Sequence, residues 1–313
     1  MSAPPINADS RGVFVIAVTP FRPDGAIDFA SIDSVVEFYI ERGISGMTIM
    51  GMMGEAPKLS ATESVEVMTR YLERVAGRVP VVVGVSNAGL DNLAALSSQA
   101  MDHGAAGVMV APTPGLTTEQ ALYRYFESVF TALGPDVPVC YQDYPQSTGV
   151  PISVPTLGGL VDDFDQLVMF KHEDCPGLAK LSELRRAESQ GRRRVSVLVG
   201  NGGLYLPLEM ARGADGAMTG FAYPEMLVQV VDLFLDGRPD DGEELFDAYL
   251  PLVRYEQQPG LGLAVRKTTL ARRGAIAHAD TRRPGPALGP IELIELDRLM
   301  RRLEHRLAEG GST

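Results

Sequence analysis

The 313-residue sequence contains no tryptophan, only two cysteines and no long hydrophobic run. Two cysteines cannot form a disulfide framework, which is typical of proteins in a reducing compartment. The apolar runs, such as Val79–Val85, are far shorter than the ~20 residues that a membrane-spanning helix needs. Met1–Ser10 shows no basic region followed by an apolar stretch, so the sequence predicts no signal peptide. We therefore expect a cytoplasmic protein that does not bind membranes.

Basic residues are also scarce. The chain has 28 lysines and arginines against 40 aspartates and glutamates, a formal net charge of −12. A negative surface repels phosphate backbones, which argues against nucleic acid as a partner. The His, Cys, Asp and Glu residues show no metal-ligand spacing, so we expect no metal site. Hydrophobic residues make up 45% of the chain, which is ample material for a large core.

Short β-branched runs alternate with longer amphipathic segments. Most of the runs are almost continuously apolar, which is typical of strands buried on both faces of a parallel sheet. Ser60 to Glu63 fits a capping box at the start of one helix between them, and Asp91 precedes another. The predicted strands are Val13–Val18, Met47–Met50, Val81–Val85, Val108–Ala111, Val137–Tyr141, Leu167–Lys171, Ser196–Val199 and Gly216–Thr219.

Eight strands by about residue 236 predict an α/β fold, the (β/α)8 TIM barrel, whose usual length is ~250 residues. A doubly wound sheet is the alternative, but no glycine fingerprint follows Val18. Gly-x-x-Gly repeats at 43–46, 104–107 and 213–216 fit a chain that turns from a helix into the next strand. We assign residues 1–236 to the barrel and 237–313 to a C-terminal helical extension. The extension is expected to hold helices over Asp240–Glu256, Leu261–Arg273 and Ile291–Leu307.

Lys171 ends the predicted strand Leu167–Lys171. Catalytic groups of such barrels lie at the C-terminal ends of strands and in the loops that follow. A lysine at the rim of an apolar core loses the hydration of its charged form, which favours a neutral, nucleophilic amine. The alternative from position alone is a structural ion pair with Glu173 or Asp174.

Several motifs in the same order resemble the dihydrodipicolinate synthase / N-acetylneuraminate lyase family of class I, Schiff-base-forming aldolases, over nearly the whole chain. This resemblance implies the same barrel with C-terminal helices and a small-molecule 2-oxo acid, usually pyruvate, as substrate. It also implies no cofactor and a homo-oligomer, a tetramer or a dimer. By position, Lys171 is the imine-forming lysine of the family. The matching pieces are Val18-Thr19-Pro20-Phe21, Gly51-Met52-Met53-Gly54-Glu55, Ala111-Pro112, Tyr141 to Gly149, Phe170-Lys171, Gly213-Ala214-Asp215-Gly216 and Arg282 to Pro290.

The turn Gly51–Glu55 matches the family's turn that binds the substrate carboxylate. Its backbone N–H groups can do so whatever the side chains are. Met52 and Met53 replace the hydroxyl residues common in the family, and we interpret Glu55 as structural. Asn201 and Thr219, at the ends of two later strands, are further substrate-binding candidates.

The family's acid/base tyrosine has no unique match in this chain. Gln142 takes its place when Pro145 is the anchor, and we expect Gln142 to contact substrate. Tyr144, in the mouth loop, is our first candidate for the tyrosine and Tyr141 is the second. Asp143 or Glu173 is a further alternative, since carboxyl groups in apolar mouths can act as acid/base groups. His172 faces the opposite way from the lysine, and a packing role is expected for it.

Two departures from the family narrow the reaction. Ser147 stands where lysine-biosynthetic members carry an arginine, and Thr113-Pro114-Gly115 stands where they carry a tyrosine. We therefore predict a lyase, an aldolase or a dehydratase, that acts on pyruvate or a related 2-oxo acid but does not make dihydrodipicolinate. The alternative is a non-catalytic barrel that binds a 2-oxo acid as a sensor or scaffold.

Overall fold

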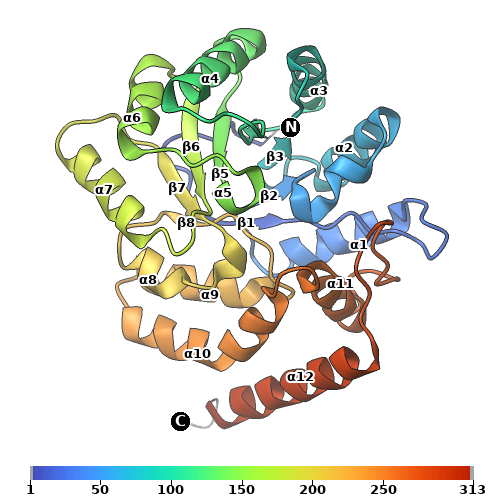
Figure 1. Cartoon of the computed structure of the whole chain (residues 1–313). Helices are drawn as coiled ribbons and strands as arrows, with labels where there is room; N and C mark the ends of the chain where they lie inside the picture. Colours follow the sequence, from blue (N-terminus) through green and yellow to red (C-terminus); the bar gives the residue numbers. More distant parts are fainter. Residues whose placement is uncertain (1–2, 311–313) are drawn as a thin grey trace.

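The computed structural model describes residues 3–310 and shows eight parallel strands that close into a barrel in chain order (Figure 1). This arrangement confirms the predicted (β/α)8 fold, and each strand begins and ends within two residues of its predicted range. The strands are β1 (Gly12–Ile16), β2 (Gly46–Ile49), β3 (Val81–Gly84), β4 (Gly107–Val110), β5 (Val139–Asp143), β6 (Leu167–His172), β7 (Ser196–Val199) and β8 (Gly216–Ala217).

Helices surround the barrel and continue beyond it. Those that follow the strands are α1 (Phe29–Ile40), α2 (Ala61–Val75), α3 (Leu90–Asp102), α4 (Glu119–Leu133), α5 (Pro145–Thr148), α6 (Val154–Asp163), α7 (Leu178–Ser189), α8 (Leu206–Met210) and α9 (Pro224–Leu235). The extension holds α10 (Pro239–Glu256), α11 (Gly262–Arg272) and α12 (Pro290–Gly310), close to the predicted ranges. Within residues 3–310, no helix is both long and apolar enough to cross a bilayer.

Alternation along the strands divides the core into two layers. Val13 and Val15 of β1 pack outward against the helices, whereas Phe14 and Ile16 point into the barrel. The inner layer is apolar and therefore leaves the polar ends of the strands as the place for chemistry. It consists of Phe14, Ile16, Val82, Met109, Cys140, Met169, Leu198 and Met218, with Ile6 and Ala106.

The local signals in the sequence act largely as expected. Ser60 and Glu63 form both hydrogen bonds of the capping box of α2. Gly43, Gly104 and Gly213 have positive φ values of 76°, 87° and 90°, and a strand begins three residues after each. The expectation for Asp91 is wrong: Gly89 is the N-cap of α3. Asp91 lies inside the first turn, where a negative charge still complements the helix dipole.

Candidate active site

Lys171 lies inside the mouth of the barrel, near the C-terminal end of β6. Met169, two residues earlier, belongs to the inner layer, so Lys171 continues the same face of the strand. The residue is 4% exposed. The neighbouring strands pair Lys171 with Gln142 of β5 and Leu198 of β7.

Lys171, Glu173 and Gln142 form one buried cluster. The Lys171 Nζ lies 2.9 Å from the Oε2 of Glu173, and the Gln142 amide donates to the same oxygen at 2.7 Å. Glu173 comes two residues after Lys171 and therefore shares its inward direction. Gly200, after β7, makes room for this carboxylate, because a Cβ at Gly200 would stand 2.1 Å from the Glu173 Cγ.

Lys171 forms the ion pair with Glu173 that the sequence offered as the alternative to a free amine. The sequence favoured an amine held neutral by apolar surroundings, whereas the structure places a carboxylate beside it. The alternative partner Asp174 instead pairs with Lys180 at 2.8 Å. The Glu173 carboxylate is therefore the group within reach to accept a proton from the Lys171 Nζ, 2.9 Å away.

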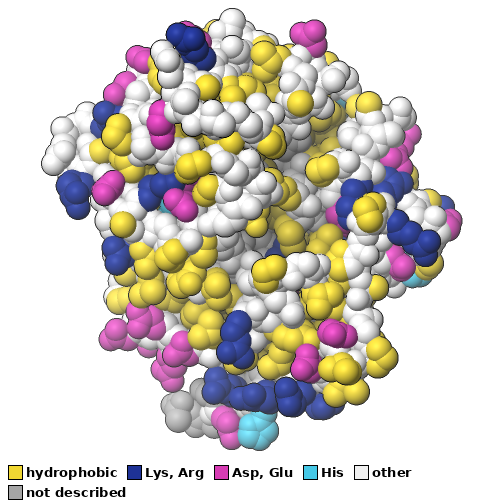
Figure 2. Space-filling model, viewed as in Figure 1, with side chains coloured by type: hydrophobic (Ala, Val, Ile, Leu, Met, Phe, Trp, Pro, Cys, Tyr) yellow, Lys and Arg dark blue, Asp and Glu magenta, His cyan; other side chains and the backbone are white. Residues whose placement is uncertain are grey.

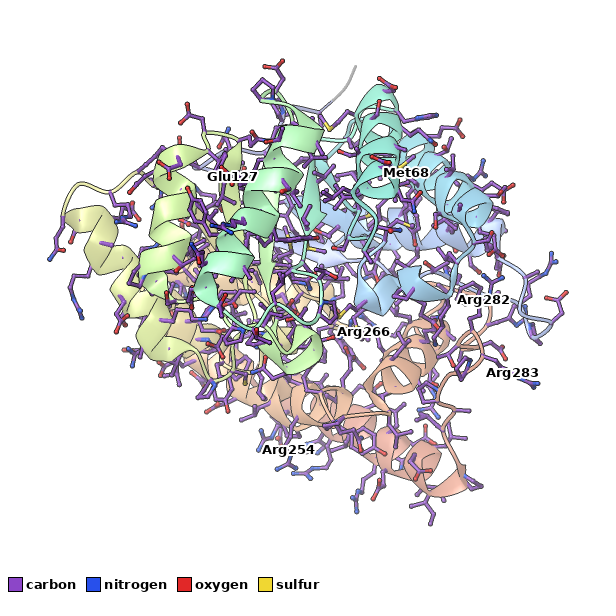
Figure 3. All side chains as sticks on the ribbon, turned by 45° about the horizontal axis from the view of Figure 1, so that its top comes forward. Met68, Glu127, Arg254, Arg266, Arg282 and Arg283 are labelled. Atoms are coloured by element: carbon purple, nitrogen blue, oxygen red, sulfur yellow. The ribbon has the colours of Figure 1, made fainter. Side chains whose placement is uncertain are left out.

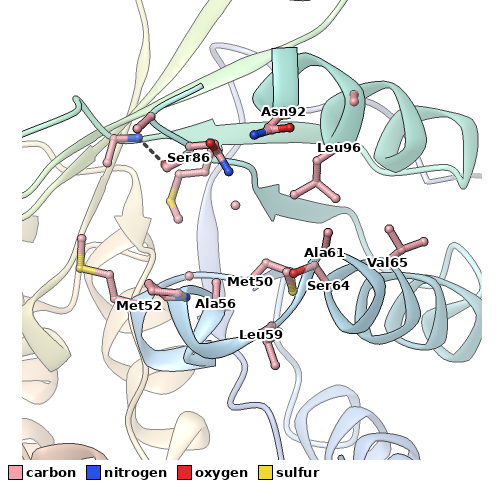
Figure 4. Close-up of a pocket in the computed structure, with 18 of the residues that line it drawn as sticks. Met50, Met52, Ala56, Leu59, Ala61, Ser64, Val65, Ser86, Asn92 and Leu96 are labelled. Carbon is pink, nitrogen blue, oxygen red and sulfur yellow. Dashed lines mark hydrogen bonds between the residues drawn. The ribbon is translucent and has the colours of Figure 1, made fainter. Parts of the chain in front are cut away.

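A cavity of about 570 Å³ opens beside this cluster. It extends outward between α2 and α3, with Ala61, Ser64 and Val65 on one side and Asn92 and Leu96 on the other (Figure 4). Figure 2 shows the hollow at this end of the molecule, rimmed mostly by uncharged atoms. No Lys, Arg, Asp or Glu is among the described residues that line the cavity.

Gln142 connects the cavity with the buried pair. It lines the cavity and also binds Glu173, whereas Lys171 itself does not line the cavity. Gln142 therefore links the wall of the cavity to the carboxylate that pairs with Lys171.

The turn after β2 borders the same cavity. Met52–Gly54 form a 3-10 turn, and Gly51 and Met52 line the cavity. The first N–H groups of such a turn, here those of Met52 and Met53, have no acceptor inside it. The Met53 side chain packs on the inner layer, and the Ser147 hydroxyl lies 3.2 Å from the Met52 sulfur.

The two tyrosine candidates lie in different places. Tyr141 is fully buried in the outer layer, with ring centroids 4.4 Å from Phe126 and 5.6 Å from Phe170. The structure therefore does not bring Tyr141 to Lys171. Tyr144 is the half-buried N-cap residue of α5, and burial raises its pKa, with a further rise from the charge of Glu173.

The other candidates are engaged within the protein. Asp143 is buried on the outward face of β5, where it accepts a hydrogen bond from Lys180. Asn201 donates to the Glu173 carbonyl at 3.1 Å, and the Thr219 hydroxyl accepts from the Gly202 amide at 2.7 Å. Both hold the loop after β7 in place. The packing role expected for His172 is confirmed, since its ring stacks on Phe170.

No group of three or more His, Cys, Asp and Glu side chains in the described part of the chain could hold a metal ion. The sequence interpretation named Glu173 and Gln142 separately and missed that they form one cluster with Lys171. The proximity of Lys171 and Glu173 could have been predicted from the sequence, because residues two positions apart in a strand point in the same direction.

Comparisons with known proteins place the chain among lyases. Residues 9–306 match the model of the Dihydrodipicolinate synthetase family. The chain is 34% identical over 300 residues to an L-2-keto-3-deoxyarabonate dehydratase of Azospirillum brasilense, a match that covers 94% of each protein. It is 30% identical over 247 residues to a 4-hydroxy-tetrahydrodipicolinate synthase of Methanococcus maripaludis, covering 78% of this chain and 82% of that protein.

Among solved structures, a dihydrodipicolinate synthase from Rhodopseudomonas palustris superimposes with a TM-score of 0.94. It is 46% identical in sequence and covers 96% of this chain and 100% of that chain.

Proposed function

Because this chain belongs to the dihydrodipicolinate synthetase family, a family of lyases, we propose that it forms a Schiff base with a 2-keto-3-deoxy sugar acid and dehydrates it. Lys171 is the nucleophile and Glu173 the acid/base group. The observation that carries the proposal is the buried contact of Lys171, Glu173 and Gln142 at the mouth of the barrel. The relative whose name states a dehydratase supports the choice of reaction.

Imine formation begins with a proton transfer. Glu173 accepts a proton from the Lys171 ammonium group, 2.9 Å away, and the neutral Nζ adds to the C2 carbonyl of the substrate. Glu173 returns the proton to the carbinolamine oxygen, which leaves as water and yields the protonated imine. The substrate carboxylate binds the free N–H groups of Met52 and Met53 at the edge of the cavity.

Dehydration then uses the imine as an electron sink. Glu173 removes a proton from C3, and the electrons of that C–H bond form the enamine. The enamine expels hydroxide from C4, which takes the proton from Glu173 and leaves as water, so that a C3–C4 double bond forms. A second water molecule adds to C2 and releases the unsaturated 2-oxo acid and the lysine amine. One water molecule is lost overall.

Gln142 and Tyr144 complete this site. Gln142 holds the carboxylate of Glu173 where the family's tyrosine is expected, so the acid/base role passes to the carboxylate. Tyr144 lies at the mouth, where the charge of Glu173 reaches it, and acts as a second polar contact for the substrate hydroxyls. A proton relay built on Glu173 argues against the non-catalytic sensor or scaffold.

The cavity also argues against the synthesis of dihydrodipicolinate. That reaction needs a cation for the carboxylate of the aldehyde partner, and Ser147 occupies the place of the arginine. No Lys or Arg among the described residues lines the cavity. An uncharged hydroxylated chain fits such a surface better than a second carboxylate does.

Trapping with borohydride tests the nucleophile. Incubation with pyruvate and borohydride is expected to add one reduced pyruvate to the parent protein, measured by mass spectrometry. Lys171→Ala is expected to remove the adduct, and Lys171→Arg to abolish turnover while circular dichroism stays unchanged. Turnover by a folded Lys171→Arg variant, or no adduct with any 2-oxo acid, would overturn the proposal.

A comparison of two sets of substrates tests which reaction the protein catalyses. We expect 2-keto-3-deoxyarabonate to be dehydrated, as followed by the appearance of a new aldehyde or unsaturated 2-oxo acid. Pyruvate with aspartate semialdehyde is expected to give no condensation product. Condensation without dehydration would show that the chain is a synthase like the relative from Methanococcus maripaludis.

We also propose that the protein is a homo-oligomer, a tetramer or a dimer, in the cytoplasm. The family resemblance supports the oligomer, and sedimentation velocity measures it. The free thiols of Cys140 and Cys175 suit a reducing compartment.

A further inference from the structure

The turn beside the cavity is bounded by two residues in the left-handed backbone region. Met50 has φ 58° and Glu55 has φ 56°. Residues other than glycine persist in this region only where their surroundings hold them there. Gly84 leaves room for this path, because a Cβ at Gly84 would stand 2.4 Å from the Met50 carbonyl oxygen.

The Glu55 carboxylate anchors one end of the turn. Glu55 is 2% exposed, and all of its partners come from outside the cavity. Its Oε1 accepts from the Lys267 Nζ at 2.6 Å, and its Oε2 accepts from the Lys58 Nζ at 2.8 Å and the Arg282 amide at 3.0 Å. Two of these three donors belong to the C-terminal extension.

Lys267, on α11, is the buried centre of this network. Its side chain is fully buried, and its Nζ also donates to the carbonyls of Thr19 at 2.8 Å and Asp280 at 2.9 Å. The three N–H bonds of the ammonium group are thereby used, one each for the turn, the segment after β1 and the C-terminal loop. The Thr19 hydroxyl donates to the Gly54 carbonyl and fixes the turn a second time.

The C-terminal loop is itself fastened to the barrel. The Arg282 guanidinium group pairs with Glu63 of α2 and donates to the Lys58 carbonyl. Figure 3 shows Arg282 where the loop meets the barrel, while the exposed Arg254 lies on the outer side of α10. The extension therefore contacts the mouth of the barrel directly, through the buried Lys267 and the half-buried Arg282.

We propose that Lys267 is a positioning residue, which acts through Glu55 to hold the N–H groups of Met52 and Met53 where they bind the carboxylate of the 2-oxo acid. This inference rests on the proposed function. Lys171 on β6 and Glu173 just after it make no hydrogen bond or ion pair with the described residues of this network. Loss of Lys267 therefore weakens the binding of the 2-oxo acid more than the chemistry at its C2 atom.

Lys267→Met tests the inference by separating half-saturation from rate. The pyruvate concentration that gives half-maximal borohydride trapping is expected to rise about tenfold, the effect of one lost charged hydrogen bond. The trapping rate at saturating pyruvate is expected to stay within about threefold of the parent, because Lys171 and Glu173 keep their positions. Lys267→Arg is expected to recover part of the loss.

Arg185→Met is the matched control. Arg185 forms an ion pair with Asp215, which immediately precedes β8 and therefore lies at the opposite end of the barrel. The Arg185→Met substitution is expected to lower the melting temperature without changing the half-saturating pyruvate concentration. If Lys267→Met does not fold, Glu55→Gln tests the same inference. Its half-saturating pyruvate concentration is expected to rise several fold.

An unchanged half-saturation in the folded Lys267→Met or Glu55→Gln variant would overturn the inference, as would an equal rise in Arg185→Met. The absence of any adduct in the parent protein would instead overturn the proposed function, so the two failures are distinguishable.

Discussion

At the scale of single residues, the site depends on which way each side chain points from a strand. The sequence interpretation identified Lys171 and named Tyr144 ahead of Tyr141, but parity alone left the tyrosine undecided. The structure separates the candidates, because Tyr141 is fully buried in the outer layer and Gln142 points inward. A carboxylate two residues after Lys171 therefore stands nearest to the amine.

Glu209 is a further buried carboxyl group, and among the described residues it has no charged partner within hydrogen-bond distance. It is 3% exposed, its Oε2 has no hydrogen-bond partner among the described residues, and burial raises its pKa from 4.5 to about 8. The folded protein thus keeps a proton on Glu209 between pH 4.5 and 8, where the unfolded chain has lost it. Stability contributed by this group falls as the pH rises through that window.

We predict that Glu209→Gln removes this dependence. The free energy of unfolding of the parent should fall relative to the variant by about 1.4 kcal/mol per pH unit at most between pH 5 and 8. Urea unfolding at several pH values measures it. Glu188→Gln is the control, because arginine partners lower the pKa of Glu188. The change that this substitution makes in the free energy of unfolding should therefore be constant between pH 5 and 8. Parallel curves for parent and Glu209→Gln would contradict the prediction.

At the scale of elements, the ends of neighbouring strands must leave space for one another's side chains. The strand ranges and the C-terminal helices follow from apolar runs and helical spacing, which are local features. The fit of β6 against β7 is not local. Gly200 has no side chain, and the Glu173 carboxylate occupies the space where one would be.

We therefore predict that Gly200→Ala displaces Glu173. Because the new Cβ would stand 2.1 Å from the Cγ, 2.5 Å from the Oε1 and 2.6 Å from the Cδ of Glu173, the whole side chain must leave its position beside Lys171. A misplacement of this size lowers kcat for dehydration about 100-fold. Steady-state kinetics with the 2-keto-3-deoxy acid measure the loss.

Gly159→Ala is the matched control for this change. A Cβ at Gly159, within α6, meets only ordinary contact with Tyr123 at 3.6 Å, and kcat should equal that of the parent. A parental kcat in Gly200→Ala would show that the position of Glu173 does not limit the reaction.

At the scale of the whole molecule, the extension has two separate relations to the barrel. α11 and the loop after it contact the mouth through Lys267 and Arg282. α12 instead packs on α10, away from the strands, as Figure 1 shows near the C-terminus. Its Leu296 and Leu303 are buried there.

We predict that truncation after Gly289 lowers stability but leaves imine formation intact. Burial of two leucines contributes about 3–6 kcal/mol, and removal of α12 exposes the apolar surface of α10 that covers them. Thermal unfolding measures the loss, and borohydride trapping with pyruvate should reach the parental level at a permissive temperature. Leu303→Ala offers a milder version of the same change. A folded, truncated protein without an adduct would place part of the site on α12.

The amino-acid sequence by itself determined the barrel and the helical extension, and it identified Lys171 as the candidate nucleophile. All three follow from local sequence patterns, namely apolar runs, helical spacing and a polar residue at the end of a buried strand. Only the tertiary structure placed Glu173 beside Lys171 and Lys267 beside Glu55 at the end of the turn. Glu173 meets Gln142 across two strands and Lys267 meets Glu55 from more than 200 residues away, and such contacts arise from the closure of the barrel, which no local pattern records.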